Sequence, residues 1–228
     1  MKVVLLHAYP LDERMWEPQL EALRDYDVVT PRLYGRGRTL DEYAASVLAE
    51  ADGELVVVGA SFGGYTALAM AYREPARVRA LGLVDARVDA DSPDRRAGRA
   101  GTKALIEQRG AQGLWEDQRT KLLLEDAGEG AVKSAEEQVL ARSEEELVEA
   151  LEAIRDRADH SETLATFAGL VFVGVGEDDL FYPADEAQRQ ASTAQHARFR
   201  VFAGARHLPS LEQPGEFNAA LAGFLADV

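Results

Sequence analysis

The chain has 228 residues, 46% of them hydrophobic, and carries a formal net charge of −15, which suits one domain with an insertion or two small domains. The charge argues against a nucleic-acid partner, because nothing in the sequence is basic enough to follow a phosphate backbone. No cysteine is present, which excludes disulfides, thiolate catalysis and cysteine-based zinc sites.

The N-terminal run VVLLH (3–7) predicts a strand, because His7 interrupts it early and no cleavage site of a secretory signal follows. No apolar run in the chain approaches the roughly 20 residues that span a bilayer. We therefore expect a soluble, cytoplasmic protein with no membrane partner.

Short runs of β-branched residues alternate with helical spacing toward both ends of the chain. Several of these runs are apolar throughout, which is typical of strands covered on both faces in a doubly wound parallel sheet. The expected strands are 3–7, 27–31, 54–59, 79–85, 170–176 and 198–204, and the expected helices are 15–23, 41–51, 62–73 and 213–226.

The middle of the chain has no convincing strand but several amphipathic helices. Ser143 and Glu146 form an S-x-x-E capping box that begins one of them. We expect residues 1–90 and 166–228 to form an α/β core, into which residues 91–165 are inserted as a helical cap.

A G-x-S-x-G motif, Gly59 to Gly63, lies between a predicted strand and a predicted helix. Such a turn raises a serine hydroxyl at the sheet edge, and the glycines let strand and helix approach each other. Ser61 is the candidate nucleophile, and the N–H of Phe62 would face a substrate oxygen. The alternative is a tight turn that packs a glycine-rich helix start.

Serine needs a base to become nucleophilic, and the chain offers four histidines. His207 follows a predicted strand at its carboxyl end, where sites of α/β proteins gather, and is the best candidate. His160 and His196 lie in polar stretches typical of a surface. His7 ends the first strand.

For the acid that orients the base, Glu177, Asp178 and Asp179 directly follow a buried-type strand. Three adjacent carboxylates repel each other, so one is expected to bind an imidazole while the others face water. The order serine, Asp179, histidine is that of α/β hydrolases. A solvated loop is the alternative for the trio, and Asp85, at another strand end, is the second-choice acid.

These motifs together resemble the α/β-hydrolase superfamily of serine esterases, and most of all the 3-oxoadipate enol-lactone hydrolases and related carboxylesterases. LLHAYPLDERMWEPQ and GASFGGYTALAMA are similar to the family's first loop and serine turn. VGVGEDDLFYP and GARHLPSLEQPGEFNAALAGFL are similar to its acid and histidine loops. The resemblance implies the α/β-hydrolase fold, with Asp179 as the acid and His207 as the base.

The sequence departs from the family in two places. It opens on what would be the family's third strand, so we expect a smaller sheet of about six strands, mostly or wholly parallel, without the N-terminal hairpin. The family's H-G pair is His7-Ala8 here, so Ala8 must adopt an ordinary φ or bear strain. The resemblance gives the second oxyanion N–H to Tyr9, and His7 would shape this loop.

The expected function is hydrolysis of a small carboxylic ester or lactone through an acyl-enzyme on Ser61, with no metal or organic cofactor. The Phe62 and Tyr9 N–H groups would form the oxyanion hole. Tyr9, Leu114 and Trp115 are candidate residues for lining the substrate pocket.

Overall charge favours neutral substrates over anionic ones, unless Arg95, Arg96 or Arg99 near the cap supplies a local cation. A C–C bond hydrolase or an acyltransferase with the same triad, and a slow-turnover ligand receptor, remain alternatives. Dehalogenases and epoxide hydrolases are disfavoured, because position 61 is serine and not aspartate. The sequence does not distinguish a monomer from a homodimer.

Overall fold

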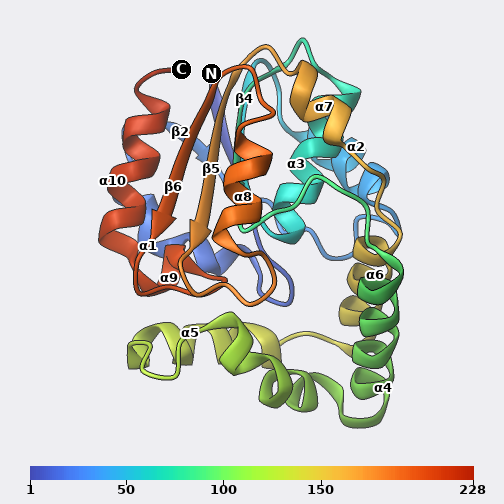
Figure 1. Ribbon diagram of the computed structural model, residues 1–228. Coiled ribbons are helices and arrows are strands. Elements are labelled where there is room, and N and C mark those ends of the chain that lie inside the picture. Colours follow the sequence, from blue (N-terminus) through green and yellow to red (C-terminus); the bar gives the residue numbers. More distant parts are fainter.

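Six parallel strands form a single sheet in the order β2-β1-β3-β4-β5-β6 (Figure 1). The computed structural model describes residues 1–228. The sheet confirms the predicted wholly parallel, six-stranded arrangement, in which the carboxyl ends of all strands lie at one edge. The strands are β1 (Lys2–Leu6), β2 (Asp27–Val29), β3 (Leu55–Ala60), β4 (Val78–Val84), β5 (Leu170–Gly176) and β6 (Ala197–Phe202).

The inner strands β3 and β5 are apolar along their whole length, as expected where helices cover both faces of a sheet. Along β1, Val4 and Leu6 point into one hydrophobic cluster, whereas Val3 and Leu5 point into the other. This period of two sends neighbouring residues to opposite faces. In Figure 1, α10 covers one face, and α3 and α8 lie on the other. The flanking helices are α1 (Glu17–Leu20), α2 (Leu40–Glu50), α3 (Phe62–Arg73), α8 (Ala184–Ala191), α9 (Pro209–Glu212) and α10 (Pro214–Leu225).

The helix expected at 15–23 is shorter than predicted. A 3₁₀ turn, Glu13–Trp16, comes first, and α1 follows with Pro18 in its first turn. The Asp12 carboxylate caps the 3₁₀ turn by accepting the N–H of Arg14.

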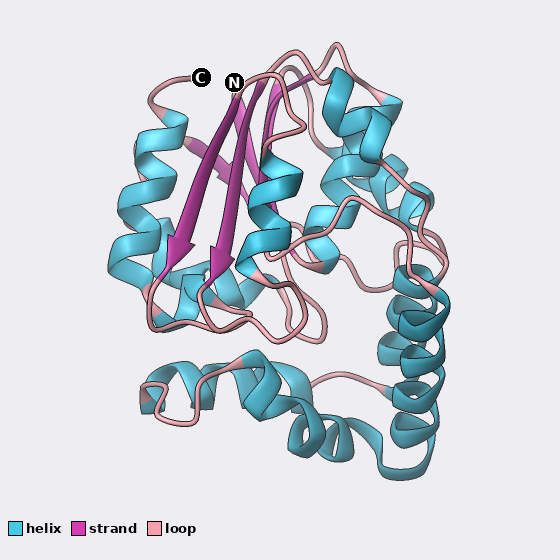
Figure 2. Cartoon of the chain, in the orientation of Figure 1, coloured by secondary structure: helices cyan, strands magenta, loops and turns pink.

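Four helices are inserted between β4 and β5: α4 (Pro93–Leu122), α5 (Glu129–Leu140), α6 (Glu144–Arg155) and α7 (Ser161–Thr166). The capping box that was predicted at Ser143 is present at the start of α6. The long α4 is interrupted at Gly110, where φ is +61°. Figure 2 shows α4, α5 and α6 on the side to which the strands point, whereas α7 packs near α3. None of the helices is both long and apolar enough to cross a membrane.

Candidate active site

Ser61 lies on the sharp turn between β3 and α3, with φ 47° and ψ −109°. This positive φ is unusual for a residue with a side chain and is costly unless the surroundings enforce it. The surroundings do so: a Cβ on Gly59 would overlap the backbone of Gly63, and a Cβ on Gly63 would overlap the carbonyl of Leu6. The two glycines of the motif are therefore required by close packing of strand, turn and helix.

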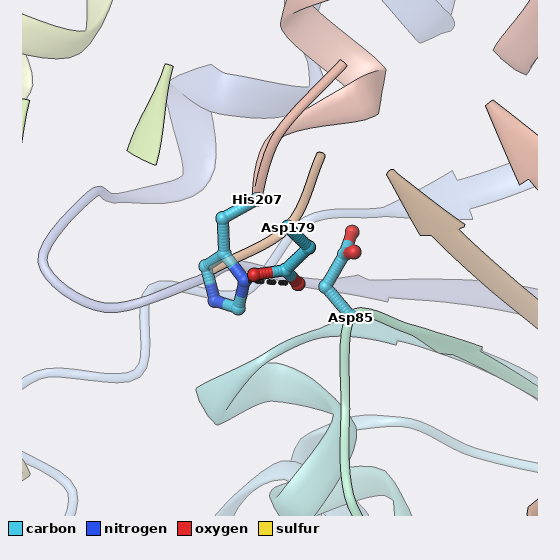
Figure 3. Close-up of side chains that lie close together, drawn as sticks. All are labelled: Asp85, Asp179 and His207. Carbon is cyan, nitrogen blue, oxygen red and sulfur yellow. Dashed lines mark hydrogen bonds and ion pairs between the residues drawn. The ribbon is translucent and has the colours of Figure 1, made fainter. Parts of the chain in front are cut away.

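The imidazole of His207 and the carboxylate of Asp179 form a buried hydrogen-bonded pair (Figure 3). His207 Nδ1 lies 2.8 Å from Asp179 Oδ2. The other oxygen, Asp179 Oδ1, accepts the backbone N–H groups of Phe181 and Tyr182 at 2.7 and 3.2 Å. Because the carboxylate faces Nδ1, that nitrogen carries the proton and Nε2 is left free to accept one.

Asp179 is held in its ionised form. Burial alone would raise the pKa of its carboxyl group, but the charge of His207 and the hydrogen bonds that it receives hold the pKa below its usual value. Asp85, Asp179 and His207 also lie close enough together for a metal ion. The direct bond between His207 Nδ1 and Asp179 Oδ2 joins two of these side chains to each other.

A cavity of about 410 Å³ opens at the carboxyl ends of the strands and is lined by both Ser61 and His207. Its volume is in the range of small-molecule sites. Ser61 follows β3 and His207 follows β6, so the parallel topology brings together two residues that are distant in sequence. Asp179 lies behind His207, in the loop after β5.

The inserted helices form part of the cavity wall, but not with the residues expected from the sequence. Leu122, Leu151 and Ile154 line the cavity. Leu114 and Trp115 are buried in the two hydrophobic clusters instead and are absent from the lining. Their apolar character therefore reports core packing, which the helical spacing alone did not distinguish from contact with substrate.

The loop after β1 brings Tyr9 to the cavity. The backbone strain considered for Ala8, which stands where the family has glycine, is absent. Ser61 and Asp85 are the only non-glycine residues with positive φ, so Ala8 has an ordinary backbone conformation. Phe62 begins α3 directly after Ser61 and is fully buried. The hydroxyl of Tyr9 is buried without a hydrogen-bond partner, and burial raises its pKa, so it remains a neutral donor.

His7 shapes this loop from beneath. Its Nε2 accepts the N–H of Leu33 at 2.9 Å, and Nδ1 lies 3.1 Å from the carbonyl of Ala8, to which it donates. Both nitrogens are thus engaged within the protein. Of the other two histidines, His196 is exposed, as expected, whereas His160 is buried beside the ring of Tyr72. The expected surface position of His160 was wrong, because α7 packs that residue toward α3.

Burial lowers the pKa of His7 from 6.5 to about 4. Between pH 4 and pH 6.5 the imidazole is protonated in the unfolded chain but neutral in the folded chain. The free energy of unfolding therefore has its full value above pH 6.5 and decreases as the pH falls toward 4. We expect this residue to remove about 3 kcal/mol from the free energy of unfolding over that interval. Urea denaturation at several pH values measures it, comparing wild type with His7→Gln. His196→Gln is the control and should keep the wild-type slope; an equal slope in His7→Gln would contradict the assignment.

A cluster of arginines flanks the cavity, with Arg157 buried and Arg95 and Arg99 partly exposed. Arg95, Arg99 and Arg157 line it, and all three pair with Asp91. Arg157 Nη1 lies 2.6 Å from Asp91 Oδ1, while Arg157 Nη2 is buried without a partner. Arg96, which the sequence grouped with Arg95 and Arg99, pairs with Asp156 instead and does not line the cavity. Arg157 could not be predicted as a cavity residue from the sequence, because no local pattern links it to Asp91.

A parallel sheet, a serine on a strained strand–helix turn and a buried Asp–His pair at neighbouring strand ends are features of the α/β-hydrolase fold. The chain belongs to the alpha/beta hydrolase family, whose model matches residues 3–220. This result confirms the family resemblance predicted from the motifs.

Solved structures share the whole fold. An esterase from Thermogutta terrifontis, determined with malate bound, is 27% identical with a TM-score of 0.93, covering 100% of this chain and 90% of that one. An enol-lactonase from Burkholderia xenovorans is 22% identical with a TM-score of 0.89, covering 99% and 91%.

Two curated relatives match this chain over part of their own length. Lipase LipV of Mycobacterium tuberculosis is 33% identical over 101 residues, which cover 40% of this chain and 39% of the lipase. The acetyltransferase component of the acetoin cleaving system of Cupriavidus necator is 26% identical over 240 aligned positions, covering 96% of this chain and 62% of that protein. In both cases the match spans less than two thirds of the relative's length.

Proposed function

We propose that this protein is a serine hydrolase that cleaves a small carboxylic ester or lactone through an acyl-enzyme on Ser61. One observation carries the proposal: Ser61 lines the same cavity as His207, which is hydrogen-bonded to a buried, ionised Asp179. The esterase from Thermogutta terrifontis and the enol-lactonase from Burkholderia xenovorans, which share this fold, lend support.

In this proposal, Ser61 Oγ attacks the substrate carbonyl carbon while His207 Nε2 takes the hydroxyl proton. Asp179 orients the imidazole and stabilises its charged form. The N–H groups of Phe62 and Tyr9 donate to the oxyanion of the tetrahedral intermediate. His207 then returns the proton to the departing alkoxide, and a water molecule, activated by the same base, hydrolyses the acyl-enzyme. The reaction uses no metal or organic cofactor and no partner beyond the small substrate.

The class of reaction is tested by labelling with a fluorophosphonate probe, followed by mass spectrometry. We expect one adduct on the peptide that contains Ser61, and a burst of alcohol release from a short aryl ester. Ser192, exposed at the end of α8, is the matched serine and should stay unlabelled. Binding of an ester without an adduct or turnover would contradict the proposal and favour a ligand receptor.

Acyl transfer is the second candidate, and the similarity to the Cupriavidus necator acetyltransferase component favours it. The acyl group of the same acyl-enzyme would then be transferred to an added alcohol or thiol in place of water. Partitioning of the acyl group between water and such acceptors, measured from product ratios, decides between hydrolysis and transfer.

The arginines beside the cavity change the expectation for substrate charge. The net charge of the chain argues for neutral substrates, but Arg95, Arg99 and Arg157 pair with only two carboxylates, those of Asp91 and Asp89. Local positive charge therefore exceeds local negative charge along this wall. We include esters and lactones that carry a carboxylate in the proposed substrate class. The malate bound to the Thermogutta terrifontis esterase, a dicarboxylate, is consistent with this extension.

Arg99→Gln is expected to lower kcat/KM for a carboxylated lactone roughly tenfold relative to a neutral analogue, because a charged hydrogen bond contributes about 1.5 kcal/mol. Glutamine can still donate to Asp91, so the wall should keep its shape. Arg96→Gln, three residues away and outside the cavity, is the control and should leave the ratio as in wild type. Equal losses on both substrates in Arg99→Gln would contradict a role in charge recognition.

A further inference from the structure

Asp85 stands directly behind the proposed catalytic pair, although the mechanism above does not use it. It follows β4 and is 1% exposed. Figure 3 shows its carboxyl group beside that of Asp179, and ligand atoms of Asp85, Asp179 and His207 lie within 4.8 Å of one another. Two carboxyl groups this close in a buried site cannot both be ionised without a large repulsive cost.

The backbone of Asp85 holds the side chain in this place. Its φ is +48°, and Ser61 is the only other non-glycine residue with a positive φ. A positive φ is costly in most residues and tends to persist where a site requires it. Asp85 N–H donates to the carbonyl of Gly174 at 2.9 Å, and Asp85 Oδ1 accepts the N–H of Gly176 at 2.9 Å. These two bonds tie Asp85 to β5, the strand whose loop carries Asp179.

The two oxygens of Asp85 have different surroundings. Oδ1 receives its hydrogen bond from Gly176, whereas Oδ2 is buried and receives none. An ionised oxygen left without a donor in such a site is expensive. A protonated Oδ2 removes this cost, because its O–H becomes a donor to the neighbouring carboxylate of Asp179.

The charged groups around Asp85 act in the same direction. Asp179 faces it from the loop after β5 and Glu212 acts on it from α9, and both are acidic. Burial first, and then the charge of Asp179, raise the pKa of the Asp85 carboxyl well above its usual value. His207 pairs with Asp179. Arg87, which lines the same cavity, is paired with Glu186.

We propose that Asp85 is a positioning residue: a protonated carboxylic acid that donates its Oδ2 hydrogen to Asp179 and keeps that carboxylate aligned on His207. Asp85 then shares one negative charge and one proton with Asp179. Asp85 is among the residues that line the cavity, but in this proposal it takes no part in bond making or breaking and acts through Asp179. This inference rests on the proposed function of the site.

The distinguishing variant is Asp85→Asn. Because Gly176 N–H must meet an oxygen, the amide oxygen takes the place of Oδ1 and the NH₂ group takes the place of the protonated Oδ2. Asparagine thus reproduces a neutral acid in both shape and donor, and it tolerates a positive φ. Asp85→Gly accepts the same φ but removes the donor, and Asp85→Ala removes the donor while keeping a Cβ.

We expect Asp85→Asn to keep kcat within about threefold of wild type, while Asp85→Gly and Asp85→Ala lose on the order of 10- to 100-fold from a misaligned base. The midpoint of the acid limb of kcat/KM should be the same in wild type and Asp85→Asn, since no charge is removed. If Asp85 were ionised, its removal would lower that midpoint by about one pH unit or more.

Three results would overturn the inference: a lowered acid limb in Asp85→Asn, an equal loss of kcat in Asp85→Asn and Asp85→Gly, or wild-type kcat in Asp85→Gly. Thermal unfolding of each variant is measured alongside the kinetics. A merely structural role would change the stability of the variants, but it would not explain the unchanged acid limb of kcat/KM or the retained kcat in Asp85→Asn.

Infrared spectroscopy tests the protonation state without reference to turnover. A protonated carboxylic acid band at about pH 8, where an ordinary aspartate is ionised, should be present in wild type and absent from Asp85→Asn. If hydrolysis survives in Ser61→Ala, the proposed function fails, while this band still decides whether Asp85 carries the proton. Absence of the band from wild type overturns the inference.

Discussion

Ser61→Ala is expected to lower kcat for ester hydrolysis by about 10⁴- to 10⁶-fold, because it removes the nucleophile and with it the acyl-enzyme. The fold should survive the change. The Ser61 side chain makes no capping hydrogen bond to α3, and alanine keeps the Cβ in the same strained turn. KM should change little, because substrate binding depends on the cavity wall. Steady-state kinetics with a short aryl ester measure kcat and KM, and thermal unfolding measures whether the fold is retained.

The control for Ser61→Ala is Ser192→Ala. Ser192 is exposed, and its hydroxyl donates to the carbonyl of Gln188 far from the strand ends. It should retain wild-type kcat. Turnover by Ser61→Ala within tenfold of wild type would contradict covalent catalysis at this serine.

Asp179→Asn is expected to lower kcat by about 10⁴-fold through the wrong imidazole tautomer. The N–H groups of Phe181 and Tyr182 point at Oδ1, so the amide oxygen of asparagine must occupy that place. Its NH₂ group then replaces Oδ2 and donates to His207 Nδ1. The imidazole proton moves to Nε2, which can no longer accept the proton of Ser61.

Asp178→Asn is the matched control for this variant, because Asp178 is adjacent in sequence but exposed. It should keep kcat near the wild-type value. The pH profile adds a second measurement: in Asp179→Asn, activity should recover at high pH, where hydroxide replaces the missing base. If kcat falls as far in Asp178→Asn as in Asp179→Asn, the assignment of Asp179 as the acid among the three adjacent carboxylates is contradicted.

The fold could be predicted from local patterns, because each of them has a local cause. Unbroken apolar runs indicate strands covered on both faces, and the glycines around Ser61 indicate a turn where strand and helix nearly touch. A one-residue error at a strand end, as at Lys2 or Ala197, changes none of this. The short α1 was harder to predict, since Pro18 and the cap of Asp12 divide one helical pattern into two pieces.

Parts of the site could not be predicted for a different reason. Apolar spacing shows that a helix face is buried, but it does not show which surface buries it. Leu114 and Trp115 were the candidates for lining the substrate pocket, but they lie in the hydrophobic clusters, whereas Leu151 and Ile154 line the cavity. Among the arginines beside the cavity, Arg157 pairs with Asp91 from a segment far away in sequence, and no local pattern predicts that contact.

The sequence by itself determined which residues end the parallel strands, and therefore which side chains gather at one edge: Ser61, Asp85, Asp179 and His207. That follows because all strands of a parallel sheet present their carboxyl ends together. Only the tertiary structure decided how these side chains are oriented toward one another. Hydrogen bonds from Phe181 and Tyr182 orient Asp179 toward His207, whereas Asp85, tied to Gly176, is left beside it with one oxygen that has no donor. The direction of a carboxyl group depends on neighbours that no strand pattern specifies.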